Sequence, residues 1–326
     1  MNQNKIGRTP PVRWIDLGIS WFDQYAADGQ PASPALNLSE ILGYLDTTSL
    51  AFLTLHSAAR DSSDQTGLIL SIHEQISRAE AEFCGRILDN GADLGRWLAE
   101  PATGLTWVAL CLDQPLTRIS AEDFDGLRKR GIHCVPLDPQ GNIPQQLEFL
   151  ESRVSDQGPK LGLDLSEIPA AEIDGVLDQR ALRPKLESRT LPLLRSVPAS
   201  LVEALPDPTL GRLARAGGLV GISLKGSSPD QVRSSIERVE QMRKSQNLPA
   251  FLALSSGFLS KAKADPAFSN TARLEKTLNE WFGPSLTGGL LHGHASDFIT
   301  RWIGPAIQPV VVPNAVESTR FDRPEY

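Results

Sequence analysis

Few side chains in this sequence have a type and spacing that would do chemistry on their own. His292 and His294 have the H-x-H spacing of a metal-binding pair, but a solvated helix start has the same pattern. Ser256 lacks the G-x-S-x-G turn of a nucleophilic serine, and no phosphate loop, dinucleotide fingerprint or EF-hand is present. Lys225 follows an apolar run where a Schiff-base lysine could sit, although the adjacent Gly226 favours a surface loop. Local motifs therefore support neither covalent serine catalysis nor nucleotide binding.

Composition excludes further classes of function. The 326 residues carry 39 acidic against 32 basic side chains, a net charge of −7, with no long run of either sign. This balance disfavours nucleic acid and anionic membranes as partners. Of the three cysteines, Cys111 and Cys134 lie in apolar runs typical of buried thiols, so a disulfide scaffold is not expected. The polar segment Met1–Arg13 has no apolar core and no long apolar run follows, so we expect a soluble cytoplasmic protein.

Short apolar runs alternate with amphipathic stretches, as expected of βα units around a parallel sheet. Most of the runs are continuously apolar, which is typical of strands covered on both faces. The eight expected strands are Val12–Gly18, Leu50–Leu55, Leu105–Leu112, Ile132–Leu137, Leu161–Leu165, Leu191–Leu194, Leu219–Leu224 and Ala250–Leu254.

The stretches between these runs predict helices. They are Ser39–Leu45, Leu68–Leu88, Ala121–Arg130, Gln145–Asp156, Ala170–Leu177, Pro208–Ala216, Pro229–Ser245 and Arg273–Phe282, with a further helix at Leu286–Ile303. Gly131, Gly217 and Gly283 follow three of them, where glycine is the favoured terminator. We predict a single (β/α)₈ TIM barrel over residues 1–326, with 304–326 as a tail that wraps the surface; a doubly wound open sheet is the alternative.

Five stretches, in order along the chain, resemble the membrane (renal) dipeptidase family of zinc peptidases. The most characteristic is LGRLARAGGLVGISL at Leu210–Leu224, which is similar to the family's "L-x-x-L-A-x-x-G-G-V-V-G-I". The others are TTSLAFLTLHS, LRKRGIHCVPLDPQGNIP at Leu127–Pro144, LDLSEI at Leu163–Ile168 and LLHGHASDFITRW at Leu290–Trp302. The resemblance covers roughly residues 12 to 303. It implies a barrel of the metal-dependent-hydrolase kind that cleaves dipeptides with a water held between two zinc ions.

The positions that match the family's zinc ligands have mostly lost their donor atoms. The family's "I-D-G-H-x-D" strand matches Ile15–Ser20, in which neither ligand is present. Its two later histidines match Glu167 and Val197, and its bridging glutamate falls near Asp113. The acidic residue that the family uses for proton transfer matches Gly257. The family's substrate-contacting histidine matches Pro139, and its arginine, expected near position 202 or 203, is missing. Asp113 and Glu167 alone could still bind a cation, a weakly held magnesium or calcium ion with waters, but not a water-activating zinc pair. We therefore expect no zinc, assign no metal site and assign no catalytic residue.

The remaining polar residues predicted at strand ends would still form a rim suited to a small charged ligand. The candidate rim residues are Asp16, His56, Asp113, Asp138, Asp164, Glu167, Arg195 and Lys225. Our leading hypothesis is a non-catalytic, dipeptidase-like binding or scaffold protein, in other words a pseudoenzyme. The alternative is a hydrolase with residual or altered metal chemistry through Asp113, Asp164 and Glu167. A homodimer and a subunit of a larger assembly both remain open.

Overall fold

The structure is a computed structural model, and the part of the chain that it describes forms an α/β fold built on parallel strands. It describes residues 15–22, 50–56, 65–82, 87–88, 107–156, 158–224, 227–255, 276–283, 297–298 and 301–302. No helix among these residues is long and apolar enough to cross a membrane.

Eight strands lie side by side in the order in which they occur along the chain, and every neighbouring pair is parallel. They are β1 (Ile15–Phe22), β2 (Leu50–His56), β3 (Trp107–Leu112), β4 (Ile132–Pro136), β5 (Leu161–Asp164), β6 (Thr190–Val197), β7 (Leu219–Ser223) and β8 (Leu252–Ser255). The sheet curls round so that β1 meets β8, with Asp16 paired to Leu254. That seam between β1 and β8 closes the barrel.

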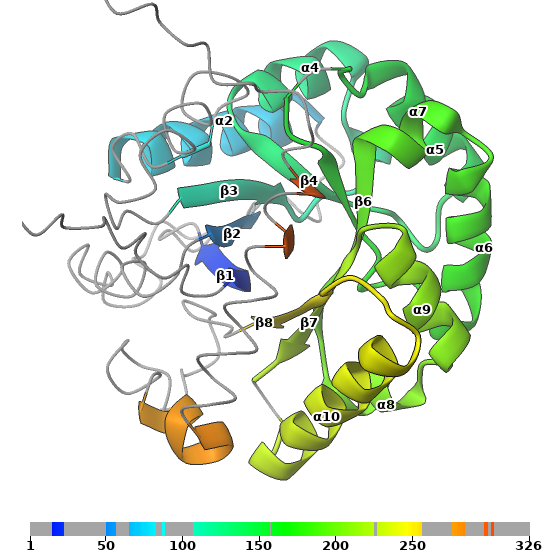
Figure 1. The fold of residues 1–326 in the computed structure, drawn as a ribbon. Coiled ribbons are helices and arrows are strands. Elements are labelled where there is room, and N and C mark those ends of the chain that lie inside the picture. Colours follow the sequence, from blue (N-terminus) through cyan, green and yellow to red (C-terminus); the bar gives the residue numbers. More distant parts are fainter. Residues whose placement is uncertain are drawn as a thin grey trace, which may run out of the picture.

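Helices cover the outside of this sheet, and most of them form an arc around β4 to β8 (Figure 1). They are α2 (Gln65–Glu82), α4 (Ala121–Lys129), α5 (Ile143–Arg153), α6 (Ala170–Ala181), α7 (Pro184–Arg189), α8 (Ala199–Ala204), α9 (Asp207–Arg215) and α10 (Pro229–Ser245). A 3₁₀ turn, η3, occupies Leu116–Arg118. Residues 276–283 are also helical.

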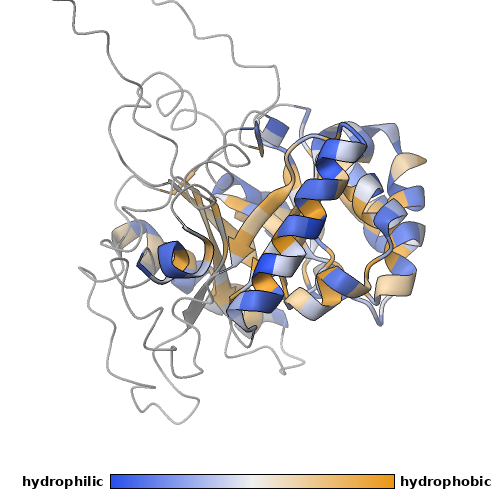
Figure 2. Ribbon diagram, turned by 60° about the horizontal axis from the view of Figure 1, so that its bottom comes forward, coloured by the Kyte–Doolittle hydropathy of each residue, from blue (hydrophilic) through white to orange (hydrophobic). Residues whose placement is uncertain are grey.

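Apolar side chains explain why these elements pack as they do. β4, β5 and β8 are buried at every position, as strands covered on both faces should be. Figure 2 shows hydrophobic colour along the strands and hydrophilic colour on the outward sides of the helices. Inside the barrel, Phe52 packs against Phe298 and Trp302, with ring centroids 6.3 and 5.8 Å away. The core therefore has two layers, one between strands and helices and one inside the strands.

Local signals place the helix ends. Ser228 and Gln231 form a reciprocal capping box at the start of α10. Gly131, Gly217 and Gly283 all have positive φ angles, of 93°, 79° and 76°, as their predicted role as helix terminators requires. Among these, Gly217 ends α9 with its amide bonded to Ala214 O at 3.0 Å.

The sequence predictions for the fold are confirmed in their coarser form. The fold is α/β with eight parallel strands near the predicted runs, and α10 has the predicted bounds. Two short helices, α7 and α8, were not predicted because each is only six residues long and begins after or at a proline. The expected helix at Ser39–Leu45 and the tail at 304–326 lie outside the described residues, as does most of the expected helix at Leu286–Ile303. That the whole chain is one domain stays a prediction.

Candidate functional site

A buried ion pair lies at the C-terminal ends of β5 and β6. Asp164 is the last residue of β5, and its Oδ2 accepts a hydrogen bond from Arg195 Nε at 2.8 Å. Only 7% of the Asp164 side chain and 12% of the Arg195 side chain are exposed. Arg195 also donates through Nη1 to Thr54 Oγ1 on β2, so its guanidinium spans the inside of the barrel. Burial alone would lower the pKa of Arg195, but Asp164 raises it above its ordinary value.

Serine side chains hold the two partners of this pair in place. Ser166 donates from its backbone N–H and from its hydroxyl to Asp164 Oδ1, at 3.0 and 2.6 Å. The same hydroxyl accepts the backbone N–H of Arg195 at 2.7 Å. One hydroxyl thus links the end of β5 to β6. Ser255 on β8 extends the network by donating to Ser196 at 2.8 Å.

Two thiols lie beside the ion pair on β3 and β4. Cys111 and Cys134 occupy paired positions in the two strands, and both are fully buried and free. Burial raises the pKa of the Cys134 thiol well above its ordinary value. Burial would also raise the pKa of Cys111, but hydrogen bonding to Cys134 and the nearby Arg195 charge lower it overall. The prediction that both cysteines are buried thiols is confirmed.

A separate pocket, the rim pocket, lies at the C-terminal ends of β3, β4 and β5. Its volume is about 230 Å³, and its charged lining residues are Asp113, Asp138, Glu167 and Arg118. Asp138 is held by its loop, since its Oδ1 accepts the N–H of Gln140 at 2.9 Å. The fully buried Gln114 donates to Asp113 Oδ1 at 3.2 Å. With three carboxylates against one guanidinium, the rim pocket favours a ligand with positive charge.

The eight residues predicted for the rim therefore fall into distinct groups. Asp113, Asp138 and Glu167 line the rim pocket together, whereas Asp164 and Arg195 pair with each other. His56 ends β2 as predicted, but its side chain lies outside the described structure, as does all of Lys225.

The placement of Asp16 at the end of its strand was wrong. β1 was expected at Val12–Gly18, but it runs from Ile15 to Phe22. Asp16 is thus the second residue of the strand and not near its C-terminal end. The cause lies in Ile19–Phe22, whose isoleucine and aromatic residues favour extended backbone and continue the pairing with β2 to His56.

The donor atoms of the described residues at the barrel mouth do not suit a zinc pair. Val197, at a position the resemblance assigns to a histidine ligand, is buried and has no donor atom. Asp164 already shares both oxygens with Arg195 and Ser166, and a fixed guanidinium beside it repels a divalent cation. Among the described residues, no three His, Cys, Asp or Glu side chains gather as metal ligands would. Gly257 and the His292–His294 pair lie outside those residues.

Sequence reasoning missed several residues of these sites. Thr54 lies inside an apolar run, so nothing in the local pattern marked its contact with Arg195. Arg118 is in the 3₁₀ turn that follows β3, a position that the general rule on barrel rims could have indicated.

Comparisons with known proteins are informative about the fold alone. No family model matches the chain, and no curated protein sequence matches it. Among solved structures, dipeptidase AC, a metallopeptidase of family M19, is similar with a TM-score of 0.61 and 12% identity. That match covers 90% of this chain and 99% of the dipeptidase. A mutant tryptophan synthase α-subunit from Pyrococcus furiosus matches with 11% identity over 83% of this chain and 99% of that chain. Its TM-score is only 0.38. The chain thus shares its fold with a metallodipeptidase.

Proposed function

We propose that this chain is a (β/α)₈ barrel of the metal-dependent-hydrolase kind that no longer hydrolyses dipeptides and instead binds a small charged molecule. The observation that carries the proposal is the Asp164–Arg195 ion pair, in which the Arg195 guanidinium binds the carboxylate of the last residue of β5. Arg195 supplies a permanent positive charge inside the barrel mouth. A guanidinium cannot hold or ionise a water as zinc does, so its position beside this carboxylate favours binding over hydrolysis.

The rim pocket is the proposed binding site. Its volume of about 230 Å³ lies below the roughly 300 to 1,000 Å³ of drug-sized sites, so it suits a very small or slender ligand. Its carboxylates Asp113, Asp138 and Glu167 favour a ligand with an ammonium group. Asp138 is oriented by Gln140 and lies beside Gln146, whose side-chain amide bonds both the N–H and the C=O of Asp138 at 2.8 and 3.0 Å. These bonds hold this side of the pocket in one conformation before a ligand arrives.

The test measures metal content, hydrolysis and binding on the same preparation. Protein purified without chelator is expected to hold far less than two zinc per chain and to leave a dipeptide such as Ala-Ala intact. Two zinc per chain together with dipeptide cleavage would refute the proposal.

Binding is probed by calorimetric titration with spermidine, a small polyamine. Glu167→Gln should weaken binding several-fold, and Glu203→Gln on the exposed surface of α8 is the matched control.

A second candidate function is a hydrolase with altered chemistry through Asp113, Asp164 and Glu167. It draws support from Asp113 and Glu167 lining one pocket, where two carboxylates could act as acid and base. Asp164 counts against it, because both of its oxygens are engaged. If the protein hydrolyses a substrate at a measurable rate, Glu167→Gln should abolish that hydrolysis. An unchanged rate would eliminate this candidate.

A role as a subunit of an assembly is a further proposal for the same scaffold. Leu182, at the end of α6, is 79% exposed and Leu70 on α2 is 64% exposed, so each could serve as a contact point. Size-exclusion chromatography of native extract distinguishes a subunit of a larger assembly from a free monomer or homodimer. Elution as a free monomer or plain homodimer would count against an assembly.

A further inference from the structure

A second pocket, the basal pocket, lies at the opposite end of the barrel from the rim pocket. Lys160, which directly precedes β5, and Gly217, two residues before β7, are among its lining residues. Arg301 also lines it and donates to Ala250 O, two residues before β8. All three positions are near the N-terminal ends of strands. With a volume of about 710 Å³, the basal pocket has the size of a small-molecule site and is far larger than the rim pocket.

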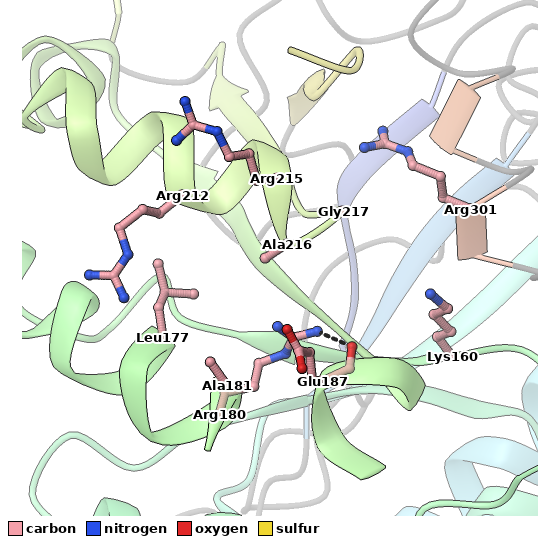
Figure 3. Close-up of a pocket in the computed structure, with 10 residues that line it drawn as sticks. All are labelled: Lys160, Leu177, Arg180, Ala181, Glu187, Arg212, Arg215, Ala216, Gly217 and Arg301. Atoms are coloured by element: carbon pink, nitrogen blue, oxygen red, sulfur yellow. Dashed lines mark hydrogen bonds between the residues drawn. The ribbon is translucent and has the colours of Figure 1, made fainter. Parts of the chain in front are cut away.

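The charged lining of the basal pocket is overwhelmingly positive. Lys160, Arg180, Arg212, Arg215 and Arg301 line it, and Glu187 is the one acidic residue among its lining residues. Figure 3 shows Arg212 and Arg215 projecting from α9 on one side, with Lys160 and Arg301 across the cavity. This concentration occurs in a chain whose net charge is −7, so the overall composition does not explain it.

Within the described residues, carboxylates neutralise only part of this charge: Glu187 acts on Arg180, and Asp297 acts on Arg301. Arg212 is paired with Asp174 and Asp178. The hydrogen bonds of Arg180, however, go to Thr190 Oγ1 and to two backbone carbonyls, and those of Arg215 go to the Gln246 amide. The guanidinium of Arg301 bonds two backbone carbonyls. Its Nη1 is buried and has no hydrogen-bond partner among the described residues.

Burial lowers the pKa of two of these cations, and neighbouring positive charges add to the shift of one of them. Burial, together with the charges of Arg180, Arg189 and Arg301, lowers the pKa of Lys160. Burial lowers the pKa of Arg180 to about 10, with partial compensation by Glu187. A bound anion would relieve this repulsion between like charges.

Of the four lining cations other than the carboxylate-paired Arg212, two have a structural explanation and two do not. Arg180 is 3% exposed and fastens the end of α6 to the start of β6, while Arg301 fastens its own segment to Ala250, two residues before β8. Lys160 uses only its backbone for such a contact, with its N–H bonded to Trp302 O at 2.9 Å and its C=O accepting from Trp302 Nε1 at 2.7 Å. The Arg215 side chain is exposed at the end of α9. The positive charges of Lys160 and Arg215 are therefore not needed for packing.

The end of α9 faces this pocket without opposing an anion. The last carbonyls of a helix carry partial negative charge, which would disfavour a negative ligand. Here the N–H of Ala216 bonds Arg212 O at 2.9 Å and the N–H of Gly218 bonds Leu213 O at 2.9 Å. These bonds occupy two of the last carbonyls of α9, which reduces the negative partial charge that faces the cavity.

We propose that the basal pocket binds a small polyanion, a molecule with two or more phosphate or carboxylate groups, through Lys160, Arg180, Arg215 and Arg301. Guanidinium groups match phosphate and carboxylate oxygens in pairs, and the lysine adds a compact charge. The site is independent of the rim pocket and of any hydrolytic activity.

The test is calorimetric titration of the full chain with inorganic pyrophosphate and, separately, with citrate, which distinguishes phosphate from carboxylate recognition. The wild type should bind at least one of them with one site per chain. Lys160→Met and Arg215→Gln should each weaken binding about tenfold, and the double variant more. Lys129→Met and Arg153→Gln, which remove the same charges from α4 and α5 at residues that do not line the pocket, should stay within twofold. Thermal unfolding of each variant verifies that it folds.

A chemical readout localises the site. Limited acylation followed by peptide mass spectrometry should modify Lys160, and pyrophosphate or citrate should protect it while leaving Lys129 unprotected. The proposal is overturned if neither anion binds at millimolar concentration. It is also overturned if Lys160→Met, Arg215→Gln and the double variant all bind as the wild type does, or if Lys160 is modified equally with and without the anion.

Discussion

At the scale of single residues, Asp164 and Arg195 matter most for the candidate site. Their ion pair is buried, whereas Asp125 and Arg153 form a pair with 43% and 35% of their side chains exposed. A buried charge that loses its partner keeps its desolvation cost without compensation. Exposed pairs are screened by water and contribute little.

Replacing Asp164 by Asn therefore tests how strongly the barrel mouth depends on this pair. We expect Asp164→Asn to lower the free energy of unfolding by about 3 kcal/mol, because Arg195 would remain buried without its counter-charge. Asp125→Asn, the same change in the exposed pair, should cost less than about 1 kcal/mol. Urea unfolding followed by circular dichroism gives both values. Equal losses would mean that water reaches Arg195 in the folded protein.

His133 makes stability depend on pH. It is fully buried between the carbonyl of Leu88, 2.7 Å from Nε2, and Arg128 Nη1, 3.4 Å from Nδ1. A carbonyl only accepts and a guanidinium only donates, so the ring is neutral with its proton on Nε2. Burial and the Arg128 charge lower its pKa from 6.5 to about 3, although the bond to Leu88 opposes the shift.

This depressed pKa predicts a specific loss of stability in acid. Below pH 6.5 the unfolded chain protonates this histidine, while the folded chain does so only near pH 3. The contribution of neutral His133 to the free energy of unfolding is thus fully present above pH 6.5. Below that pH it falls by about 1.4 kcal/mol per pH unit, which is a total loss of about 2 kcal/mol at pH 5. Urea unfolding of the wild type and of His133→Gln at pH 7 and pH 5 should show this extra loss in the wild type alone. Parallel losses in both proteins would assign the acid effect to other groups.

At the scale of elements, much of the fold could be predicted because apolar runs and glycine positions carry local information. The glycines between α9 and β7 and within β7 are an example of this local information. Gly217 has a positive φ, which the helix-end rule predicts, and Gly218 and Gly221 lie where a Cβ would strike Pro192 O and Arg195 O, at 2.2 and 2.4 Å. Side-chain partners far apart in the sequence, such as Thr54 and Arg195, depend on strand register and could not be predicted this way.

The close approach at Gly221 predicts a large effect of one methyl group. Gly221→Ala would place a Cβ 2.4 Å from the backbone oxygen of Arg195, so β6 or β7 must shift, at a cost of at least about 2 kcal/mol. Gly175→Ala, on the exposed side of α6 with nothing within 4 Å, should stabilise the protein by about 0.5 to 1 kcal/mol. Thermal unfolding of the two variants gives effects of opposite sign if the strands approach as described. A stable Gly221→Ala protein would contradict this arrangement of β6 and β7.

At the scale of the whole molecule, the barrel is not equally reinforced around its circumference. β6 pairs with β5 and β7 over several positions, and α7 and α8 are joined directly to its two ends. β1 meets β8 at one paired position, Asp16 with Leu254, although its pairing with β2 is extensive. Since few paired backbone positions must break there, the seam between β1 and β8 should open first.

Hydrogen–deuterium exchange tests this expectation. Peptides that cover β1 and β8 should exchange through a local opening, with a free energy well below that of global unfolding, whereas peptides covering β5 and β6 should exchange only on global unfolding. Added urea distinguishes the two routes, because local opening exposes little surface and responds weakly to denaturant. Saturating pyrophosphate should slow exchange near Lys160 and Gly217 without closing the seam, since the basal pocket is lined from the β5 and β7 side. Equal protection of all eight strands would show that the single β1–β8 pair closes the barrel as firmly as the longer ladders do.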